Sequence, residues 1–439
     1  MNSSANTFHM RERALAIFEY ALAECDIARA FARNVQCNDG FLRLGDESYD
    51  LSQFSRVAVV SIGKAGHSMA EAFVQIVPGK FEGVVSCPVI PAKPVAGLRY
   101  FSGGHPMPNE DSLRAGRAIL ELLRSLPADA LVLFLISGGA SAIAEWPLDD
   151  TLTLSDIAAT NRILVHSGAP IATINAVRKH LSAIKGGRMA QVAWPRKQIS
   201  LLVSDVPEHA SDALASGPTM PDSSTTSDCY AIAQRYDMIA SFPAPVGTMF
   251  ANHTLRETPK IGDPIFDNSR FVTLLSNHTA VSAAAERARG LGFFVEIDNT
   301  CDDWDYVRAA DYLLERTREL RLQAPRACVI SGGEVTVKVS ADSGVGGRNQ
   351  QFAAYCARKI AGEARTVLSA GTDGIDGNSI AAGALVDGTS AARASEAGCD
   401  ITRALEDFNV FPLLNSIGDA IVTGPTGNNV RDLRILLAY

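Results

Sequence analysis

The sequence lacks the features that mark membrane, secreted or nucleic-acid-binding proteins. No uninterrupted apolar run reaches the ~18 residues that a membrane-spanning helix needs. The first residues, "MNSSANTFHMRERALAIFEYALAECD", have neither the apolar core nor the small-residue cleavage site of a signal peptide. Its 40 basic residues are outnumbered by 48 acidic ones, which gives a formal net charge of -8. We therefore expect a cytoplasmic chain that binds neither membrane nor nucleic acid.

Paired cysteines are also lacking. The eight cysteines are scattered singly, without a CxxC pair and without a histidine at metal-ligand spacing. This pattern argues against a disulfide framework and against a structural zinc site. We expect reduced thiols that are mostly buried.

The common nucleotide and hydrolase motifs are missing as well. The segment "SIGKAGHS" fits neither the P-loop pattern GxxxxGK[ST] nor the dinucleotide pattern GxGxxG. The segment "GGASA" around Ser141 is not the GxSxG of a serine hydrolase. His209 therefore has no nucleophile in a recognised setting, and we interpret it as a structural histidine.

The chain is long enough for two domains. At 439 residues with 47% hydrophobic residues, it exceeds the size at which a single core keeps growing. Segments rich in Pro, Ser and Thr cluster between residues 222 and 265. We place the boundary near Pro245, which gives an N-terminal Rossmann-like α/β domain over residues 1–245 and a C-terminal α/β domain over residues 246–439.

Six short apolar runs end in a serine followed closely by Gly, Asp or Asn. Continuous rather than alternating hydrophobicity is typical of strands buried on both faces, and helical patterns lie between the runs. The predicted fold class is α/β, with two three-layer domains and mostly parallel sheets. Ligands of such sheets bind beyond the carboxyl ends of the strands. The runs are "RVAVVSIGK", "ALVLFLISGG", "ISLLVSDV", "FVTLLSNHT", "ACVISGGE" and "TVLSAGTDG".

Two charged residues follow such strands. Lys64, after Gly63, stands where a helix begins, which suits a phosphate or a carboxylate. A solvated lysine in a turn is the alternative. Asp205 follows "LLVS" and is placed either to take a proton from an alcohol or hold a metal ion, or simply to cap a turn.

Four glycine loops add candidate binding residues. Paired glycines let the backbone aim N–H groups at an anion, so four such loops predict an oligophosphate site, although tight turns use glycine for steric reasons alone. The candidates are Ser137, Gly138, Gly139 and Ser141; Lys185, Gly186 and Gly187; Ser331, Gly332, Gly333 and Glu334; and Gly346, Gly347, Arg348, Asn349 and Gln350.

Two further segments complete the candidate set. "NAVRKHLSAIKGGRMA" reads as a helix that offers Asn175 and Arg178 as a polar, basic patch, unless it is a solvated face. "SAGTDGIDG" contributes Thr372 and Asp373. Asp373 and Glu334 are candidate ligands for Mg²⁺, which binds through a few carboxylates plus substrate phosphates. Asp376 is equally compatible with a plain Asp-Gly turn.

The motifs together resemble a known family. "SIGKAGHSM", "GGHPMPN", "ISGGASA", "NAVRKHLSAIKGGRMA", "LLVSDVPEHASDALASGPTMPD", "ISGGEVTV", "GVGGRNQQFAA" and "SAGTDGIDG" occur in the order typical of the class II glycerate kinases, the glycerate 2-kinase family with a C-terminal MOFRL domain. The resemblance runs from about residue 10 to the C-terminus. It implies two α/β domains with the active site between them, and transfer of a phosphoryl group from ATP to D-glycerate with Mg²⁺, giving 2-phosphoglycerate.

The resemblance also implies roles for three residues. The charged site residues of the family fall on Lys64, Asp205 and Arg348. Phosphoryl transfer needs a carboxylate at the attacking hydroxyl and cations at the phosphoryl oxygens. We therefore assign Asp205 to the 2-hydroxyl, and Lys64 and Arg348 to the phosphoryl oxygens or the glycerate carboxylate.

Two other functions compete with the kinase. Relatives of this family have been labelled hydroxypyruvate reductases, which predicts NAD(P)H binding, but Lys64 and His67 break the expected glycine fingerprint. A non-catalytic module that binds a nucleotide or a sugar acid would not need a base such as Asp205. Phosphorylation at the 2- rather than the 3-position follows from the resemblance alone, and the sequence leaves open whether the chain forms a homo-oligomer.

Overall fold

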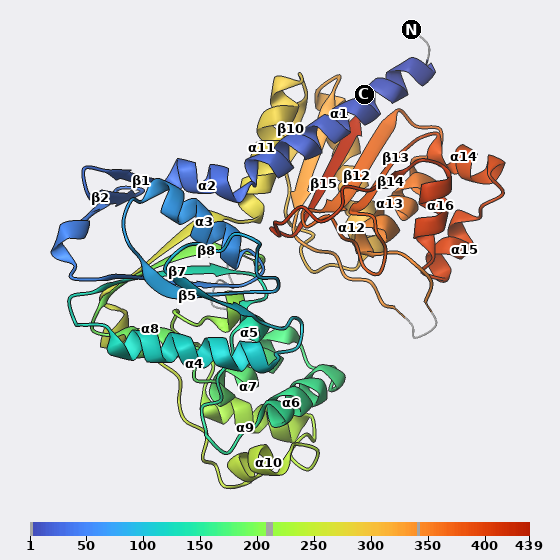
Figure 1. The fold of residues 1–439 in the computed structure, drawn as a ribbon. Helices are drawn as coiled ribbons and strands as arrows, with labels where there is room; N and C mark the ends of the chain where they lie inside the picture. Colours follow the sequence, from blue (N-terminus) through green and yellow to red (C-terminus); the bar gives the residue numbers. More distant parts are fainter. Residues whose placement is uncertain (1–2, 208–213, 340–342) are drawn as a thin grey trace. The chain divides into compact units, whose positions relative to one another are not determined.

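The chain folds into two compact units. The computed structural model describes residues 3–207, 214–339 and 343–439. The first unit is Ile27–Leu274, and the second consists of Met1–Asp26 together with Leu275–Tyr439 (Figure 1). All eight cysteines are free thiols, and six are buried. Among the described helices, none is both long and apolar enough to cross a membrane.

The first unit is built on a six-stranded sheet. Its order is β6-β5-β4-β7-β8-β9, and the pairings from β6 to β8 are parallel, as predicted. Helices α2 and α3 cover one face and α4 and α8 the other, which explains the continuous apolar runs (Figure 1). The elements are β4 Val57–Ile62, β5 Glu82–Cys87, β6 Leu98–Ser102, β7 Leu131–Ser137, β8 Lys197–Val203, β9 Ser269–Leu275, α2 Ile27–Asn34, α3 Gly66–Ile76, α4 Glu110–Ser125 and α8 Arg188–Ala193.

Two smaller parts are attached to this sheet. An antiparallel three-stranded sheet is formed by β1, β2 and β3. Helices α6, α7, α9 and α10 form a lobe with a hydrophobic core of its own, in which Leu164, Val177 and Phe250 are buried. The bounds are β1 Val35–Asn38, β2 Phe41–Leu44, β3 Glu47–Asp50, α5 Ala140–Ile143, α6 Leu154–His166, α7 Ile171–Leu181, α9 Thr226–Arg235 and α10 Ala244–Ala251.

The second unit also has three layers. Its sheet order is β10-β11-β15-β12-β13-β14, with α1 and α11 on one face and α12 to α16 on the other (Figure 1). The elements are α1 Ser3–Glu24, α11 Asn277–Gly290, β10 Phe294–Ile297, α12 Tyr306–Gln323, β11 Ala327–Gly332, α13 Arg348–Lys359, β12 Arg365–Gly371, β13 Gly383–Asp387, α14 Ser390–Glu396, α15 Ile401–Glu406, α16 Val410–Ser416, β14 Ala420–Ile421 and β15 Asp432–Ala438.

The expectation of a mostly parallel sheet is wrong for this unit. Among the pairings of its described strands, β10 with β11 alone is parallel. The C-terminal strand β15 lies between β11 and β12 and runs antiparallel to both. The predicted strands β11 and β12 therefore do run in the same direction, but they are not neighbours. A strand covered on both faces is apolar throughout in either orientation, so the hydrophobic pattern does not encode direction.

The compact units also differ from the domains expected at 1–245 and 246–439. Strand β9, beyond residue 245, is an edge strand of the first sheet. Helix α1 packs instead on the second unit, where Met10, Ile17 and Phe18 are buried against α11 and the sheet. The apolar face of α1 shows that the helix is covered, but no sequence pattern says which sheet covers it.

This packing predicts that α1 stabilises the second unit specifically. Replacing the buried Phe18 by Ala leaves a cavity between α1 and the sheet and should lower the free energy of unfolding by ~3–5 kcal/mol. Urea unfolding followed by Trp304 fluorescence, with Trp146 and Trp194 of the first unit changed to Phe, measures this loss. Phe8→Ala on the same helix is the control, because Phe8 is 61% exposed. Equal losses in the two variants would contradict the prediction.

Candidate functional site

The first group of site residues gathers at the carboxyl ends of β4 and β7. Lys64 follows β4, and its backbone N–H donates to the carbonyl of Gly138 over 2.9 Å. The next N–H, that of Ala65, donates to Oγ of Ser137 over 3.0 Å. These bonds fasten the turn before α3 to the "SGGAS" loop after β7. The Lys64 side chain is exposed, and its ammonium has no ion-pair partner among the described residues.

Asp205 joins this group through Gly138. A methyl group added to Gly138 would lie 1.9 Å from Oδ2 of Asp205, so the carboxylate lies directly against the glycine backbone. Asp205 follows β8, the neighbour of β7, and is half-buried. The structure therefore brings together the predicted residues Gly63, Lys64, Ser137, Gly138, Gly139, Ser141 and Asp205.

His105 lies in the same place and was missed by the sequence reasoning. A methyl group on Gly139 would lie 2.9 Å from Cδ2 of His105 and 3.2 Å from Cγ of Lys64. Gly139 itself has φ +79°, which a residue with a side chain rarely adopts. His105 belongs to "GGHPMPN", one of the segments on which the family resemblance depends. Its position on a loop between β6 and α4 was the sequence signal that could have identified it.

The "SGGAS" loop keeps backbone donors open. In residues 3–207, 214–339 and 343–439, no acceptor is found for the N–H groups of Gly139, Ala140 and Ser141. These groups belong to the first turn of α5, where helical N–H groups have no partner inside the helix. Open donors, an unpaired ammonium, an imidazole and a carboxylate therefore surround one short loop.

The "KGG" turn has a structural role in place of the expected phosphate cradle. The N–H groups of Gly186 and Gly187 donate to the carbonyls of Ser216 and Gly217 over 3.0 and 2.7 Å. Lys185 is 2% exposed and forms an ion pair with the buried Glu145. Burial lowers the pKa of Lys185, and Glu145 opposes that effect. A lysine this enclosed does not reach a ligand at the surface.

The basic helix α7 contributes mainly to the interior of the first unit. Nε of Arg178 donates to Oδ1 of Asn161 over 2.9 Å, and burial lowers the pKa of the guanidinium. Asn175 lies half-buried three residues earlier. Arg188, at the start of α8, is buried and donates to the carbonyl of Arg256 over 2.8 Å. The predicted positive patch is therefore engaged within the fold.

In the second unit, the "SGGE" loop is likewise satisfied by the chain itself. The N–H groups of Gly332, Gly333 and Glu334 donate to side-chain oxygens over 2.8 to 2.9 Å. Their acceptors are Asn299, Asn277 and Asp302, respectively. Ser331 is fully buried at the end of β11. The loop holds the fold, and the expected phosphate cradle is not formed there.

Asp376 occupies the start of α13, where the "GVGGRNQQ" loop was expected to bind phosphate. Its Oδ1 and Oδ2 accept the N–H groups of Asn349 and Gln350 over 3.1 and 2.9 Å. Side-chain amides of the same two residues also donate to this carboxylate. A methyl group on Gly347 would lie 2.2 Å from Cγ of Asp376, so glycine is needed for the approach of a carboxylate. The helix N-terminus is thus capped from within.

Arg348 is held by two carboxylates. Its Nε and Nη2 donate to Oδ2 and Oδ1 of Asp432 over 2.6 and 3.0 Å, and Nη2 lies 2.8 Å from Oε1 of Glu334. Burial by itself would lower the pKa of Arg348, but Asp432 and Glu334 raise it above its ordinary value. The guanidinium is permanently charged and firmly oriented. Its Nη1 has no acceptor in the part of the chain that the structure describes.

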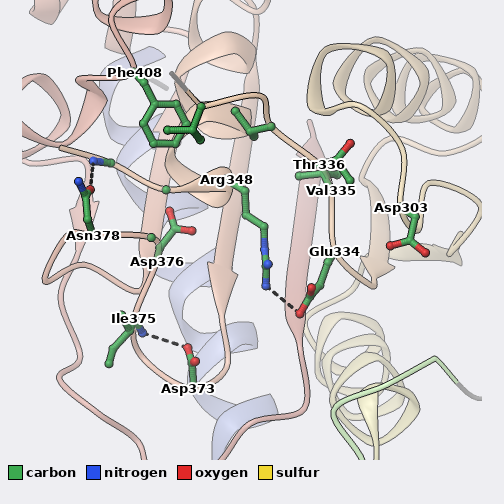
Figure 2. Close-up of a pocket in the computed structure, with 15 residues that line it drawn as sticks. Asp303, Glu334, Val335, Thr336, Arg348, Asp373, Ile375, Asp376, Asn378 and Phe408 are labelled. Atoms are coloured by element: carbon green, nitrogen blue, oxygen red, sulfur yellow. Dashed lines mark hydrogen bonds and ion pairs between the residues drawn. The ribbon is translucent and has the colours of Figure 1, made fainter. Parts of the chain in front are cut away.

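A cavity of about 680 Å³ lies beside Arg348 within the second unit. Figure 2 shows Arg348 between Asp376 and Glu334, with Asp373 and Asp303 on the same lining. The lining therefore carries four carboxylates and one guanidinium, which disfavours a bare polyphosphate. Thr372 is buried behind this wall and donates to the carbonyl of Arg431 over 2.7 Å.

The lining offers two carboxylates of the kind that bind a metal ion together with phosphate oxygens. No group of three or more His, Cys, Asp or Glu side chains is assembled for a metal within the described residues. Glu334 and Asp373 both line the cavity, and Mg²⁺ typically uses one or two carboxylates plus phosphate oxygens. Glu334 is engaged by Arg348, and Asp373 accepts the N–H of Ile375 over 3.1 Å. His209 lies outside the described residues.

Asp376 predicts a pH dependence of the second unit. Burial raises its pKa to about 6, and the charge of Asp432 adds to this effect. Between the ordinary aspartate pKa of ~4 and the raised value, the folded chain holds a proton that the unfolded chain has released, so stability falls as pH rises through that window. We expect a loss on the order of 3 kcal/mol. Asp376→Asn should abolish this pH-dependent loss of stability, measured by urea unfolding followed by Trp304 fluorescence. A variant whose unfolding free energy falls with pH as steeply as that of the wild type would contradict the prediction.

Comparisons with known proteins agree with this architecture. The model described as "Domain of unknown function (DUF4147)" matches residues 13–251, and the MOFRL family model matches residues 327–432. The D-glycerate 2-kinase of Thermotoga maritima is 36% identical over 388 residues, which cover 87% of this chain and 90% of its own. A protein of Agrobacterium vitis with a provisional hydroxypyruvate reductase name is 38% identical and covers 87% of each chain.

A solved structure has the same fold over almost the whole length. The crystal structure of glycerate kinase from Thermotoga maritima is 32% identical, with a TM-score of 0.85, and the match covers 98% of this chain and 100% of that one. The resemblance inferred from the sequence motifs is thus confirmed. The chain belongs to the glycerate 2-kinase family, which joins a DUF4147 domain to a MOFRL domain.

Proposed function

We propose that the protein transfers the γ-phosphoryl group of ATP to the 2-hydroxyl of D-glycerate, giving 2-phospho-D-glycerate and ADP. The observation that carries the proposal is the convergence at Gly138 and Gly139, where Asp205, Lys64 and open N–H donors meet. A carboxylate for the attacking hydroxyl and a cation for anionic oxygens are what phosphoryl transfer needs. The names of the relatives supply the acceptor and agree with this chemistry.

Asp205 and Lys64 have complementary roles in this proposal. The half-buried carboxylate of Asp205 accepts the hydrogen bond of the 2-hydroxyl and orients it for in-line attack. The Lys64 ammonium has no ion-pair partner among the described residues, so its charge is available to an incoming anion. The N–H groups of Gly139 to Ser141 add neutral donors beside it.

Arg348 contributes orientation more than net charge. Asp432 and Glu334 fix the plane of its guanidinium, which suits it to hold phosphoryl oxygens in a defined geometry. Glu334 and Asp373 would hold the Mg²⁺ that accompanies ATP. When bound, Mg²⁺ neutralises charge on the phosphate oxygens, which offsets the acidic lining of the cavity.

A hydroxypyruvate reductase is the second candidate, because one relative carries that name. It would require a dinucleotide site, and "SIGKAGHS" departs from the glycine pattern of such sites. Incubation of the purified protein with D-glycerate, ATP and Mg²⁺, with enolase-coupled detection of 2-phosphoglycerate, tests the kinase. Oxidation of NADH by hydroxypyruvate without phosphorylation of D-glycerate would replace the kinase proposal by the reductase. The absence of both activities would favour a non-catalytic binding module.

Removal of the Arg348 side chain should abolish most of the turnover. Loss of an arginine that stabilises the transferred phosphoryl group costs ~10³-fold or more in kcat. Arg348→Ala is therefore compared with Arg358→Ala, an exposed arginine on the same helix. Steady-state kinetics with D-glycerate and ATP give both values. Near-normal turnover in Arg348→Ala would remove Arg348 from the site.

Gly138→Ala offers a test of Asp205 that leaves the carboxylate in the chain. Gly138 has no positive φ, so alanine fits the backbone, but its methyl group would displace Oδ2 of Asp205. A displacement on the order of 1 Å in such a site can cost ~10²-fold in rate. Gly247→Ala is the control, since its methyl group meets no atom closer than 3.4 Å. Equal rates in both variants would exclude Asp205 as the group that orients the hydroxyl.

A further inference from the structure

His105 is held in a fixed place beside the "SGGAS" loop. The N–H of Gly103 donates to the carbonyl of Cys87 over 3.1 Å, and that of Gly104 donates to Oγ of Ser112 over 2.9 Å. Ser112 is in turn part of the cap that starts α4 with Asn109. The His105 loop is therefore tied to the sheet and to a helix, and the ring lies against Gly139 on the side of Lys64.

The imidazole of His105 is exposed and has no protein hydrogen-bond partner in the described part of the chain. Burial of part of the ring and the charge of Lys64 lower its pKa, so the neutral ring predominates near neutral pH. A neutral imidazole carries one N–H donor and one nitrogen acceptor. Among the three side chains around this loop, the Lys64 ammonium only donates and the Asp205 carboxylate only accepts.

An alcohol hydroxyl also donates and accepts, so a neutral imidazole can pair with it either as donor or as acceptor. D-Glycerate carries a carboxylate, the hydroxyl that attacks and a second hydroxyl. With a cation for anionic oxygen and Asp205 for the attacking hydroxyl, the second hydroxyl still needs a partner. Resting on the proposed function, we propose that His105 is a further catalytic-site residue that hydrogen-bonds the non-reacting hydroxyl and thereby selects D-glycerate over monohydroxy acids.

Comparison of D-glycerate with D-lactate, which lacks the 3-hydroxyl, isolates this contact. The two acids are compared by kcat/KM in the presence of ATP and Mg²⁺, and by dissociation constants from calorimetry where D-lactate is not turned over. Removing one partner of the bond should lower the preference for D-glycerate ~10-fold in His105→Ala. The KM for ATP should stay as in the wild type.

Matched variants separate this contact from a general structural effect. His105→Asn keeps a donor and an acceptor and should retain part of the preference, while His105→Leu repeats the test at similar size if the alanine variant does not fold. His166→Ala, an exposed histidine on α6, should leave the preference unchanged. A preference in His105→Ala and His105→Leu equal to that of the wild type would overturn the assignment while leaving the kinase intact. A wild-type protein that does not phosphorylate D-glycerate would overturn both.

Discussion

Buried backbone N–H groups must find acceptors, and this requirement decides which loops of the fold are open to a ligand. At the end of β11, side chains of Asn299, Asn277 and Asp302 take three successive N–H groups. At the start of α13, Asp376 takes two more. The "SGGAS" loop after β7 is different, since its donors at Gly139 to Ser141 find no acceptor among the described residues. Of these three loops, the "SGGAS" loop therefore offers an anion the most open N–H donors.

The charged residues of the two units differ in the same respect, namely whether the chain itself supplies their partners. Arg348 has two carboxylate partners, so its contribution is a fixed direction, and little positive potential remains around it. Lys64 has no ion-pair partner within the described structure. In the proposed kinase, Lys64 would therefore attract a negatively charged acceptor. Under the proposed function, a nucleotide beside Arg348 would need a metal ion to offset the acidic lining of the cavity.

The sequence was sufficient for the elements of the first sheet and for the edge at which Lys64 and Asp205 meet, because parallel strands place their carboxyl ends together. It was insufficient for long-range partners. The antiparallel insertion of β15, the packing of α1 on the second unit and the capping of α13 by Asp376 all join segments far apart in the chain. His105 was missed for the same reason, since its place beside Gly139 depends on the neighbouring loop.

Composition alone could not show what the paired glycines do in the fold. An added methyl group would collide with a carboxylate or amide oxygen of the chain itself at Gly138, Gly332, Gly333 and Gly347. The lack of a side chain at these glycines therefore lets that oxygen approach the backbone closely. The burial of the carboxylate then distinguishes a structural aspartate from a candidate functional one. Asp376 is almost fully enclosed and holds a helix start, whereas Asp205 is half-buried beside open donors and Lys64. The same kind of close contact fixes a helix start at Gly347 and, at Gly138, places a carboxylate beside open N–H donors.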